Sequence, residues 1–411
     1  MDPLRDIEAL LAHGARGPGT DAERRAARHL EQRLRELGRE ARIEPIQVRP
    51  SYALTHLLHA VAAIVGSVLS VSAPLAGAIV LLVTATSAFC DLTGSFHLAR
   101  RLTPSRASQN VVSLADPEPG EQADGRPGTL VLVAHYDAAR TGAPFGPRFT
   151  ERLAALGQTV RRPIGAFEPF FWSIVVVFAC AVLRLPGIDA TPLTVVQFLA
   201  TVVLIVSVPM LADVALSETV PGANDNASGV ATVLRLADRY GGDLDHFDVW
   251  VVFTGAEEGM ELGMRAWLRA HKHELDSERT AFLCVDQVGR GTVRYARREG
   301  YVIAHPQHAD LLELCDQIAE EDSDDSESER RASGRYGARS YVSRSATDAH
   351  AARVAGFPAI AVSCLGALDY APHHHLPSDT VENLDESALD RAFRFCSELI
   401  ELIDERLGPE L

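Results

Sequence analysis

The chain has 411 residues and a formal net charge of −16, enough length for one large domain or two smaller ones. An acidic balance of this size argues against a general nucleic-acid binder, which needs a basic face, so we expect no nucleic-acid partner. The six cysteines are scattered without C-x-x-C spacing. We therefore predict no disulfide framework, which fits a reducing compartment.

The first predicted element is an amphipathic helix that begins at Asp21, with Ala26, Leu30 and Leu34 at helical spacing. Residues 19–21 form the kind of cap region that such a helix needs. The segment before the helix is charged and lacks the apolar core of a signal peptide. We therefore expect no secretory leader in these residues.

An apolar stretch follows, because residues 51–90 contain no Asp, Glu, Lys or Arg. Forty uncharged residues are too many for one helix of a soluble core, whereas a membrane-spanning helix needs about 20 apolar residues. Pro74 lies near the middle of the stretch. We predict a transmembrane hairpin over 51–94, with helices at roughly 53–72 and 75–91.

A second apolar pair is predicted at 169–185 and 190–212, within an insertion that covers residues 141–216. The first segment of this pair is short and spans a bilayer only if the side chain of Arg184 reaches the far interface. The alternative is that both pairs are buried helices of a large soluble protein. We favour two transmembrane hairpins with four spans, which gives a lipid bilayer as one partner.

The arginines around these segments predict how the chain lies in the membrane. Cytoplasmic flanks of spans carry an excess of Arg and Lys. The flanking positions are Arg42, Arg49, Arg100, Arg101, Arg106, Arg161 and Arg162. The predicted protein is therefore a multi-pass membrane protein whose termini and polar segments, including any catalytic domain, face the cytoplasm.

The remaining polar segments alternate between strands and helices. Strands are predicted at 129–137, 247–258, 280–289 and 357–366, and helices within 222–240, 259–275 and 385–407. This alternation predicts an α/β domain with a largely parallel sheet, made of residues 1–50, 95–140 and 217–411. The charged, serine-rich residues 319–340 are predicted to form a surface loop.

Imidazole and carboxylate side chains gather at the ends of the predicted strands. His135, Asp137, Glu257, Glu258 and Asp286 end strands, Asp225 lies in the Gly/Asn-rich turn before a helix, and a run of three histidines follows at residues 373–375. Singly, such an Asp is usually a cap or turn residue, and a histidine run is usually a solvated loop. Ligands of α/β sheets bind beyond the carboxyl ends of the strands. Carboxylate and imidazole together predict a zinc site there.

Five short motifs occur in a recognisable order: "AHYD", "GANDNASG", "TGAEEGMELG", "VDQVG" and "HLPSDT". In these motifs the sequence resembles the co-catalytic zinc aminopeptidase family typified by bacterial leucyl aminopeptidase, aminopeptidase Y and glutamate carboxypeptidase. The resemblance implies a three-layer α/β zinc-exopeptidase fold with a mixed, largely parallel central sheet. The two transmembrane hairpins would be insertions into that fold.

The resemblance also implies two Zn²⁺ ions as cofactors. His135 and Asp286 would bind one ion, Glu258 and His375 would bind the other, and Asp225 would bridge both. The peptide bond that follows Asp225 is often cis in this family.

Catalytic roles follow from the same resemblance. Glu257 would be the general base, taking a proton from a water between the ions and passing it to the leaving amine. Asp137 would orient His135. The choice of His375 as ligand rests on the family pattern H-x-P-x-D, which makes His373 and His374 loop neighbours.

The sequence thus predicts a membrane-anchored di-zinc metallopeptidase, an aminopeptidase that acts on peptides. Two alternatives stay open: a glutaminyl-cyclase-like aminoacyl transferase, and a catalytically silent receptor or scaffold on the same fold. The second hairpin lies between His135 and Asp225, so we hypothesise a peptide substrate at the membrane surface. Peptide specificity and oligomeric state do not follow from the sequence.

Overall fold

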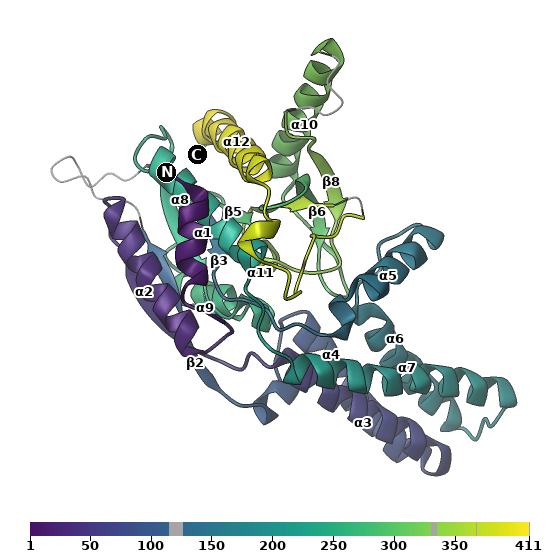
Figure 1. Ribbon diagram of the computed structural model, residues 1–411. Helices are drawn as coiled ribbons and strands as arrows, with labels where there is room; N and C mark the ends of the chain where they lie inside the picture. The colour runs from purple at the N-terminus through teal and green to yellow at the C-terminus, as the bar shows by residue number, and fades with distance from the viewer. Residues whose placement is uncertain (115–125, 330–334, 367, 411) are drawn as a thin grey trace.

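The computed structural model describes residues 1–114, 126–329, 335–366 and 368–410 (Figure 1). Within them, a nine-stranded sheet has the order β1-β2-β4-β3-β5-β9-β6-β7, with β8 paired to β6. The strands are β1 (Arg42–Val48), β2 (Arg106–Ser113), β3 (Gly128–His135), β4 (Phe247–Thr254), β5 (Thr280–Val285), β6 (Thr292–Glu299), β7 (His305–Pro306), β8 (Arg339–Val342) and β9 (Ala359–Leu365).

The middle of the sheet is parallel, as predicted. Strands β4, β3, β5 and β9 pair in parallel with one another. The outer pairs β1–β2, β2–β4, β6–β9 and β6–β7 are antiparallel. Parallel strands are buried on both faces and read as continuous apolar runs, which is why the sequence revealed the central strands and missed the edges.

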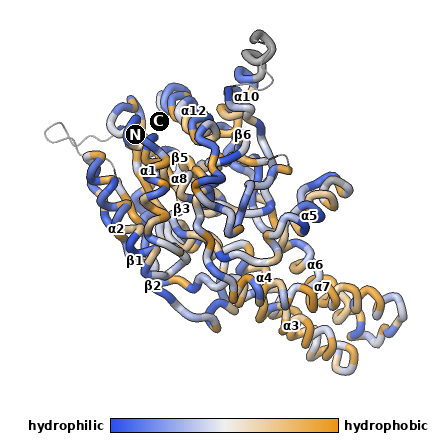
Figure 2. The backbone as a smooth tube through the Cα atoms, viewed as in Figure 1, coloured by the Kyte–Doolittle hydropathy of each residue, from blue (hydrophilic) through white to orange (hydrophobic). Residues whose placement is uncertain are grey.

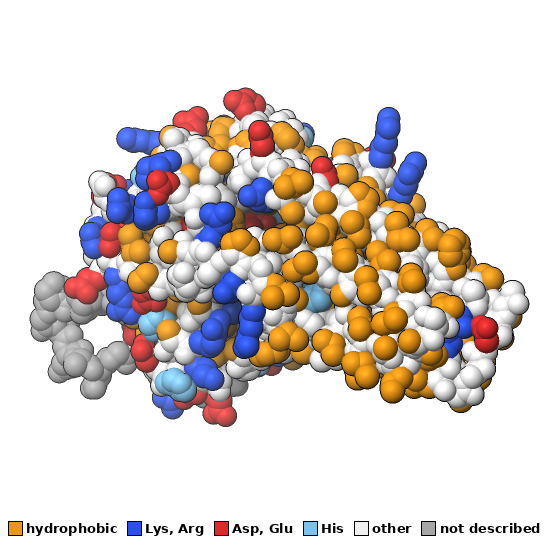
Figure 3. All heavy atoms as spheres, turned by 90° about the horizontal axis from the view of Figure 1, so that it is seen from below, with side chains coloured by type: hydrophobic (Ala, Val, Ile, Leu, Met, Phe, Trp, Pro, Cys, Tyr) orange, Lys and Arg blue, Asp and Glu red, His pale blue; other side chains and the backbone are white. Residues whose placement is uncertain are grey.

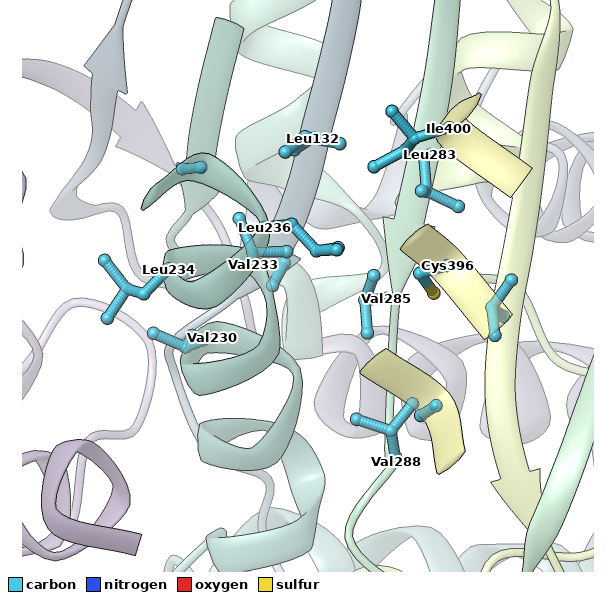
Figure 4. Packing of buried hydrophobic residues seen from close by; sticks show 14 of the residues in the cluster. Leu132, Val230, Val233, Leu234, Leu236, Leu283, Val285, Val288, Cys396 and Ile400 are labelled. Atoms are coloured by element: carbon cyan, nitrogen blue, oxygen red, sulfur yellow. The ribbon is translucent and has the colours of Figure 1, made fainter. Parts of the chain in front are cut away.

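Helices cover both faces of the sheet, so the α/β part has three layers. Leu130 and Leu132 of β3 share one buried cluster with α1, α2, α8, α10 and α12, whereas Val131 and Val133 share another with α9 and α11. Figure 4 shows α8 and α12 packing over Leu132 and Leu283. These helices are α1 (Pro3–Leu11), α2 (Asp21–Glu36), α8 (Ser228–Tyr240), α9 (Leu262–His271), α10 (Ala309–Glu329), α11 (Asp348–Val354) and α12 (Glu386–Leu402).

Four further helices project from this body as a bundle (Figure 1). They are α3 (Tyr52–Ser72), α4 (Pro74–Leu92), α6 (Phe167–Arg184) and α7 (Thr191–Leu216), and each is long and apolar enough to cross a membrane. The bundle is hydrophobic along its length and on its outer surface (Figures 2 and 3), where Val68 and Phe198 are 65% and 64% exposed. Apolar surface of this extent marks an interaction face.

Each apolar insertion leaves the α/β body and returns to it at paired residues. Val48 at the end of β1 lies opposite Arg106 at the start of β2, on either side of α3 and α4. Arg140 and Thr219 form a β-bridge on either side of the segment that holds η2 (Ala143–Phe145), α5 (Pro147–Thr159), α6 and α7. The β1–β2 pair therefore closes the first insertion, and an isolated bridge closes the second.

The prediction of a loop over residues 319–340 is wrong in two places. Helix α10 continues to Glu329, and β8 begins at Arg339. Gln317 bonds Glu321 at i,i+4 spacing, and Asp322 accepts the backbone N–H groups of Tyr336 and Gly337. Side-chain contacts thus order a segment whose composition alone predicts a loop. Residues 330–334 lie outside the described residues.

A buried polar group links three helices of the bundle. The Gln197 amide of α7 donates to Ser67 O at 2.8 Å and to Ser70 Oγ at 3.0 Å on α3, and its oxygen accepts from Arg184 Nε of α6 at 3.0 Å. Arg184 also reaches Asp189, in the connection between α6 and α7, at 2.6 Å. These bonds fix how the two hairpins pack.

Replacing Gln197 with Leu is expected to destabilise the bundle by about 1–2 kcal/mol, because buried donors on Arg184 and acceptors on α3 lose their partner. Thermal unfolding of the detergent-solubilised protein measures the change. Phe198→Leu is the matched control, since the neighbouring side chain is exposed. Equal melting temperatures for both variants would show that the network contributes nothing to stability.

Candidate metal centre

The carboxyl ends of the parallel strands bring the predicted site residues to one edge of the sheet. His135 is the last residue of β3 and lies in register with Thr254, the last residue of β4. Glu257 follows β4 by a short turn, and Asp286 directly follows β5. Parallel register therefore places the side chains of three separate motifs together.

Asp225 reaches this edge from the turn before α8. The peptide bond between Asp225 and Asn226 is cis, as the family resemblance implied. Asp379 accepts the backbone N–H groups of Asn224 at 2.7 Å and Asp225 at 3.0 Å. The Asn226 side chain donates to Val285 O at 2.9 Å. The turn is thus tied to β5 and to the histidine-bearing loop.

Two histidine–carboxylate pairs share Asp225. His135 Nε2 lies 3.3 Å from Asp225 Oδ1 and 3.4 Å from Asp286 Oδ1. His375 Nε2 lies 3.2 Å from Asp225 Oδ2 and 3.3 Å from Glu258 Oε2. Five side chains from five segments therefore converge, and Asp225 contacts the histidine of each pair.

Glu257 lies beside these pairs rather than within them. Its Oε2 lies 3.9 Å from His135 Nε2. Among the described residues, the sets that bring three ligand atoms within 4.8 Å of one another include Glu258 but not Glu257. The two adjacent carboxylates are therefore separated in space, with one inside the cluster and one at its edge.

Asp137 organises the loop that carries both glutamates. Its two carboxylate oxygens accept the backbone N–H groups of Glu257 and Glu258, each at 3.1 Å. The same carboxylate lies 3.6 Å from His135 Nδ1, which has no hydrogen-bond partner. The predicted contact between Asp137 and His135 is therefore longer than the hydrogen bonds that Asp137 accepts from the loop. The sequence analysis did not predict those hydrogen bonds.

The loop itself adopts strained backbone conformations. Ala256, Met260 and Glu261 have φ values of 52°, 77° and 58°, in the left-handed region that costs a residue with a side chain roughly 1–2 kcal/mol. Such a conformation persists only when its surroundings determine it. Glu23, from α2, supports it by accepting the Ala256 N–H at 3.0 Å.

His374 is a site residue that the sequence analysis set aside. Its Nδ1 lies 3.2 Å from Asp225 Oδ2 and 3.1 Å from Gln287 Oε1, and its ring stacks on His375 with 3.7 Å between centroids. His373 instead bonds Ser378. Asp225, His374 and His375 form one of the groups that could hold a metal ion. The histidine run was the available signal, and the family pattern selected only one of its members.

Arg16 is a second residue that the sequence analysis missed. It is fully buried and donates to Tyr136 O at 2.9 Å, Pro221 O at 3.0 Å and Gly222 O at 2.9 Å. Burial lowers the pKa of Arg16 to about 10, against the charge of Asp379. Arg16 is a single arginine in the stretch "HGAR", and no sequence pattern there predicts that its side chain is buried.

Burial raises the pKa of both adjacent glutamates, whereas, against the effect of burial, the neighbouring histidines lower the pKa of Asp225 well below its usual value. Burial raises the pKa of Glu257 well above its usual value, with His135 opposing the shift and Glu258 adding to it. Burial also raises the pKa of Glu258 to about 7, against the charge of His375. Anions crowded into a buried site need compensating positive charge.

The residues fit a zinc centre. Buried polar atoms without a hydrogen-bond partner face the cluster, namely Asp225 Oδ2, Glu258 Oε1 and Asp286 Oδ1. Imidazole nitrogen and carboxylate oxygen are ligands that zinc takes in proteins. The donor set, the orphaned oxygens and the concentration of negative charge agree with a site for cations.

Comparisons with known proteins find a matching peptidase family and similar folds. The model of Peptidase family M28 matches residues 207–400, which include Asp225, Glu258 and His375 but not His135. This match confirms the predicted resemblance to zinc aminopeptidases. No curated protein is similar enough to the chain to match.

Three solved structures show the same fold. An aminopeptidase from Aneurinibacillus sp. strain AM-1 is similar with a TM-score of 0.54 and 14% identity, over 97% of this chain and 92% of that chain. A Bacteroides thetaiotaomicron glutaminyl cyclase bound to N-acetylhistamine has a TM-score of 0.51 and 13% identity, over 97% and 96% of the two chains. LapB from Legionella pneumophila has a TM-score of 0.51 and 12% identity, over 98% and 72%. The predicted α/β fold is confirmed, and the fold alone does not separate peptidase from cyclase.

Proposed function

We propose that this chain, whose residues 207–400 match Peptidase family M28, is a membrane-anchored zinc aminopeptidase that removes N-terminal residues from peptides. The observation that carries the proposal is the convergence of two histidine–carboxylate pairs on Asp225, with Glu257 at the edge of the group. A receptor or scaffold on this fold has no need of such a set.

Two zinc ions are the proposed cofactors. His135 and Asp286 would hold one ion, Glu258 and His375 the other, and Asp225 both. The short distances within each pair and the unpaired carboxylate oxygens support this assignment. When bound, zinc makes water more acidic and polarises a carbonyl group.

Residues of the chain itself perform the proton transfers. Glu257 would take the proton of the attacking water at its carboxylate and pass it to the amine that leaves. Because burial raises the pKa of Glu257, its carboxylate is a stronger proton acceptor than an exposed one. Asp137 holds the backbone of Glu257 and Glu258, which keeps the acceptor and the ligand apart. Phe145 packs 4.3 Å from the ring of His375 and covers it.

The four apolar helices are proposed to cross a membrane, with the catalytic domain on the cytoplasmic side. The peptidase domain would consist of residues 1–50, 95–140 and 217–411, interrupted by hairpins within 51–94 and 141–216. The paired residues at which each insertion leaves and returns support this division. Since Phe145 comes from the second insertion, a peptide presented at the membrane surface is the proposed substrate.

The proposal is tested on protein purified in detergent, with a panel of aminoacyl-nitroanilides and a peptide that begins with glutamine. About two zinc ions per chain and release of nitroaniline are expected. One zinc ion and cyclisation of the glutaminyl peptide would instead identify a glutaminyl-cyclase-like transferase. Protein without zinc and without turnover would be a receptor or scaffold.

A further inference from the structure

The loop that carries Glu257 and Glu258 has a second set of contacts besides those with Asp137. Arg100, in the 3₁₀ turn Ala99–Leu102 that follows α4, is 1% exposed. Its Nη1 donates to Gly259 O at 2.6 Å, directly after the two glutamates, and to Arg49 O at 3.1 Å. A buried guanidinium therefore bonds the backbone of the active-site loop.

The same guanidinium also contacts the first hairpin, through Asp91 of α4. Arg100 Nε donates to Asp91 Oδ1 at 2.6 Å, and Asp91, in the last turn of α4, is 2% exposed. Asp91 also lies 2.9 Å from His97 Nδ1 and 3.3 Å from His56 Nε2 of α3. Both helices of the hairpin thus contact the carboxylate that orients Arg100.

Apolar contacts also connect the Glu257–Glu258 loop to the hairpins. Met260, the residue after Gly259, is buried in the cluster that contains Ala60 of α3, Leu81 of α4 and Phe170 of α6. A methyl group at Gly259 would meet Pro50 at 3.0 Å, so the backbone of the loop lies against the segment that enters α3. The left-handed conformation of Met260 is therefore fixed by groups that come from the hairpins.

We propose that Arg100 is a positioning residue that ties the Glu257–Glu258 loop to the first transmembrane hairpin. The hairpin is then a working part of the active site and not an anchor alone. The expected effect of Arg100 on catalysis rests on the proposed peptidase function. The physical tie between loop and hairpin stands on its own contacts.

The test compares Arg100→Gln with Arg101→Gln in the full-length protein. Arg101 is exposed over the ring of Phe96 and contacts neither Asp91 nor Gly259, so its variant serves as the matched control. For Arg100→Gln we expect kcat on an aminoacyl-nitroanilide to fall at least tenfold, with KM changed less than twofold. Amide hydrogen exchange in residues 255–262 should become at least tenfold faster, while exchange in β5 stays unchanged.

Arg100→Lys provides a graded comparison. The guanidinium of Arg100 donates to Asp91 and to Gly259 through separate nitrogens. A lysine ammonium is a single compact donor group and cannot reproduce both hydrogen bonds with the same geometry. Intermediate kcat and intermediate exchange in the loop are therefore expected. If Arg100→Gln does not fold, Arg100→Lys is compared with Arg101→Gln instead. Wild-type kcat and wild-type loop exchange in Arg100→Lys would then overturn the proposal.

The remaining outcomes separate the two proposals. Wild-type kcat and loop exchange in a folded Arg100→Gln protein would overturn the inference. So would faster exchange spread evenly over the sheet, since that result describes a general loss of stability. A wild-type protein without peptidase activity would refute the proposed function, whereas faster exchange confined to the loop would still support the tie.

Discussion

Replacing Glu257 with Gln is expected to lower kcat by about 10²–10⁴-fold while zinc content stays at the wild-type level. Gln keeps the size of the side chain and the backbone N–H that Asp137 accepts. It loses the carboxylate that accepts a proton. Glu257 Oε2 lies 3.9 Å from His135 Nε2, farther than the oxygens of Asp225 and Asp286, so zinc is expected to bind without it. Turnover and metal analysis of the same preparation measure both effects.

Glu258→Gln is the matched variant, one residue away. Glu258 Oε2 lies 3.3 Å from His375 Nε2, and its other oxygen has no partner. Loss of this negative charge is expected to remove about one zinc ion per chain as well as activity. If Glu257→Gln lost zinc and Glu258→Gln kept it, the roles assigned to the two glutamates would be reversed.

Replacing His375 with Ala is expected to weaken zinc binding by more than about 100-fold and abolish turnover, whereas His374→Ala should weaken binding by at most about tenfold. His375 Nε2 contacts both Asp225 and Glu258, so it completes a ligand pair. Of the site carboxylates, His374 contacts Asp225 and not Glu258, and the same Nδ1 also lies 3.1 Å from Gln287 Oε1. The two variants thus separate a ligand from a residue that supports one.

Zinc titration against a chelator of known affinity measures both constants in detergent. Thermal unfolding of the metal-free proteins serves as the control, since both rings pack in one stack. Equal losses of zinc affinity would mean that both histidines bind the metal. A larger loss of zinc affinity for His374→Ala would identify His374 as the ligand. The family pattern H-x-P-x-D would then have selected the wrong histidine.

The sequence by itself determined the centre of the sheet, the apolar helices and the candidate site residues other than His374 and Arg16. Buried parallel strands read as continuous apolar runs, and each run stops at the polar residues that enter the site, as at His135 and Asp286. The signal for the apolar hairpins is equally local, because length and hydrophobicity suffice to recognise them. Edge strands such as β2, and the helical extent of α10, carry weaker local signals and were missed or mispredicted.

Only the tertiary structure decided how these parts support one another. Arg100 and Gly259 are 159 positions apart in sequence, and Arg16 and Gly222 are 206 apart. No periodicity or spacing records such a contact, because each depends on where distant segments are placed by the sheet and the bundle. The same holds for His374, which reaches Asp225 only through the turn of its loop. Local pattern identified most of the candidate site residues, and long-range packing determines which others join them and what holds them in position.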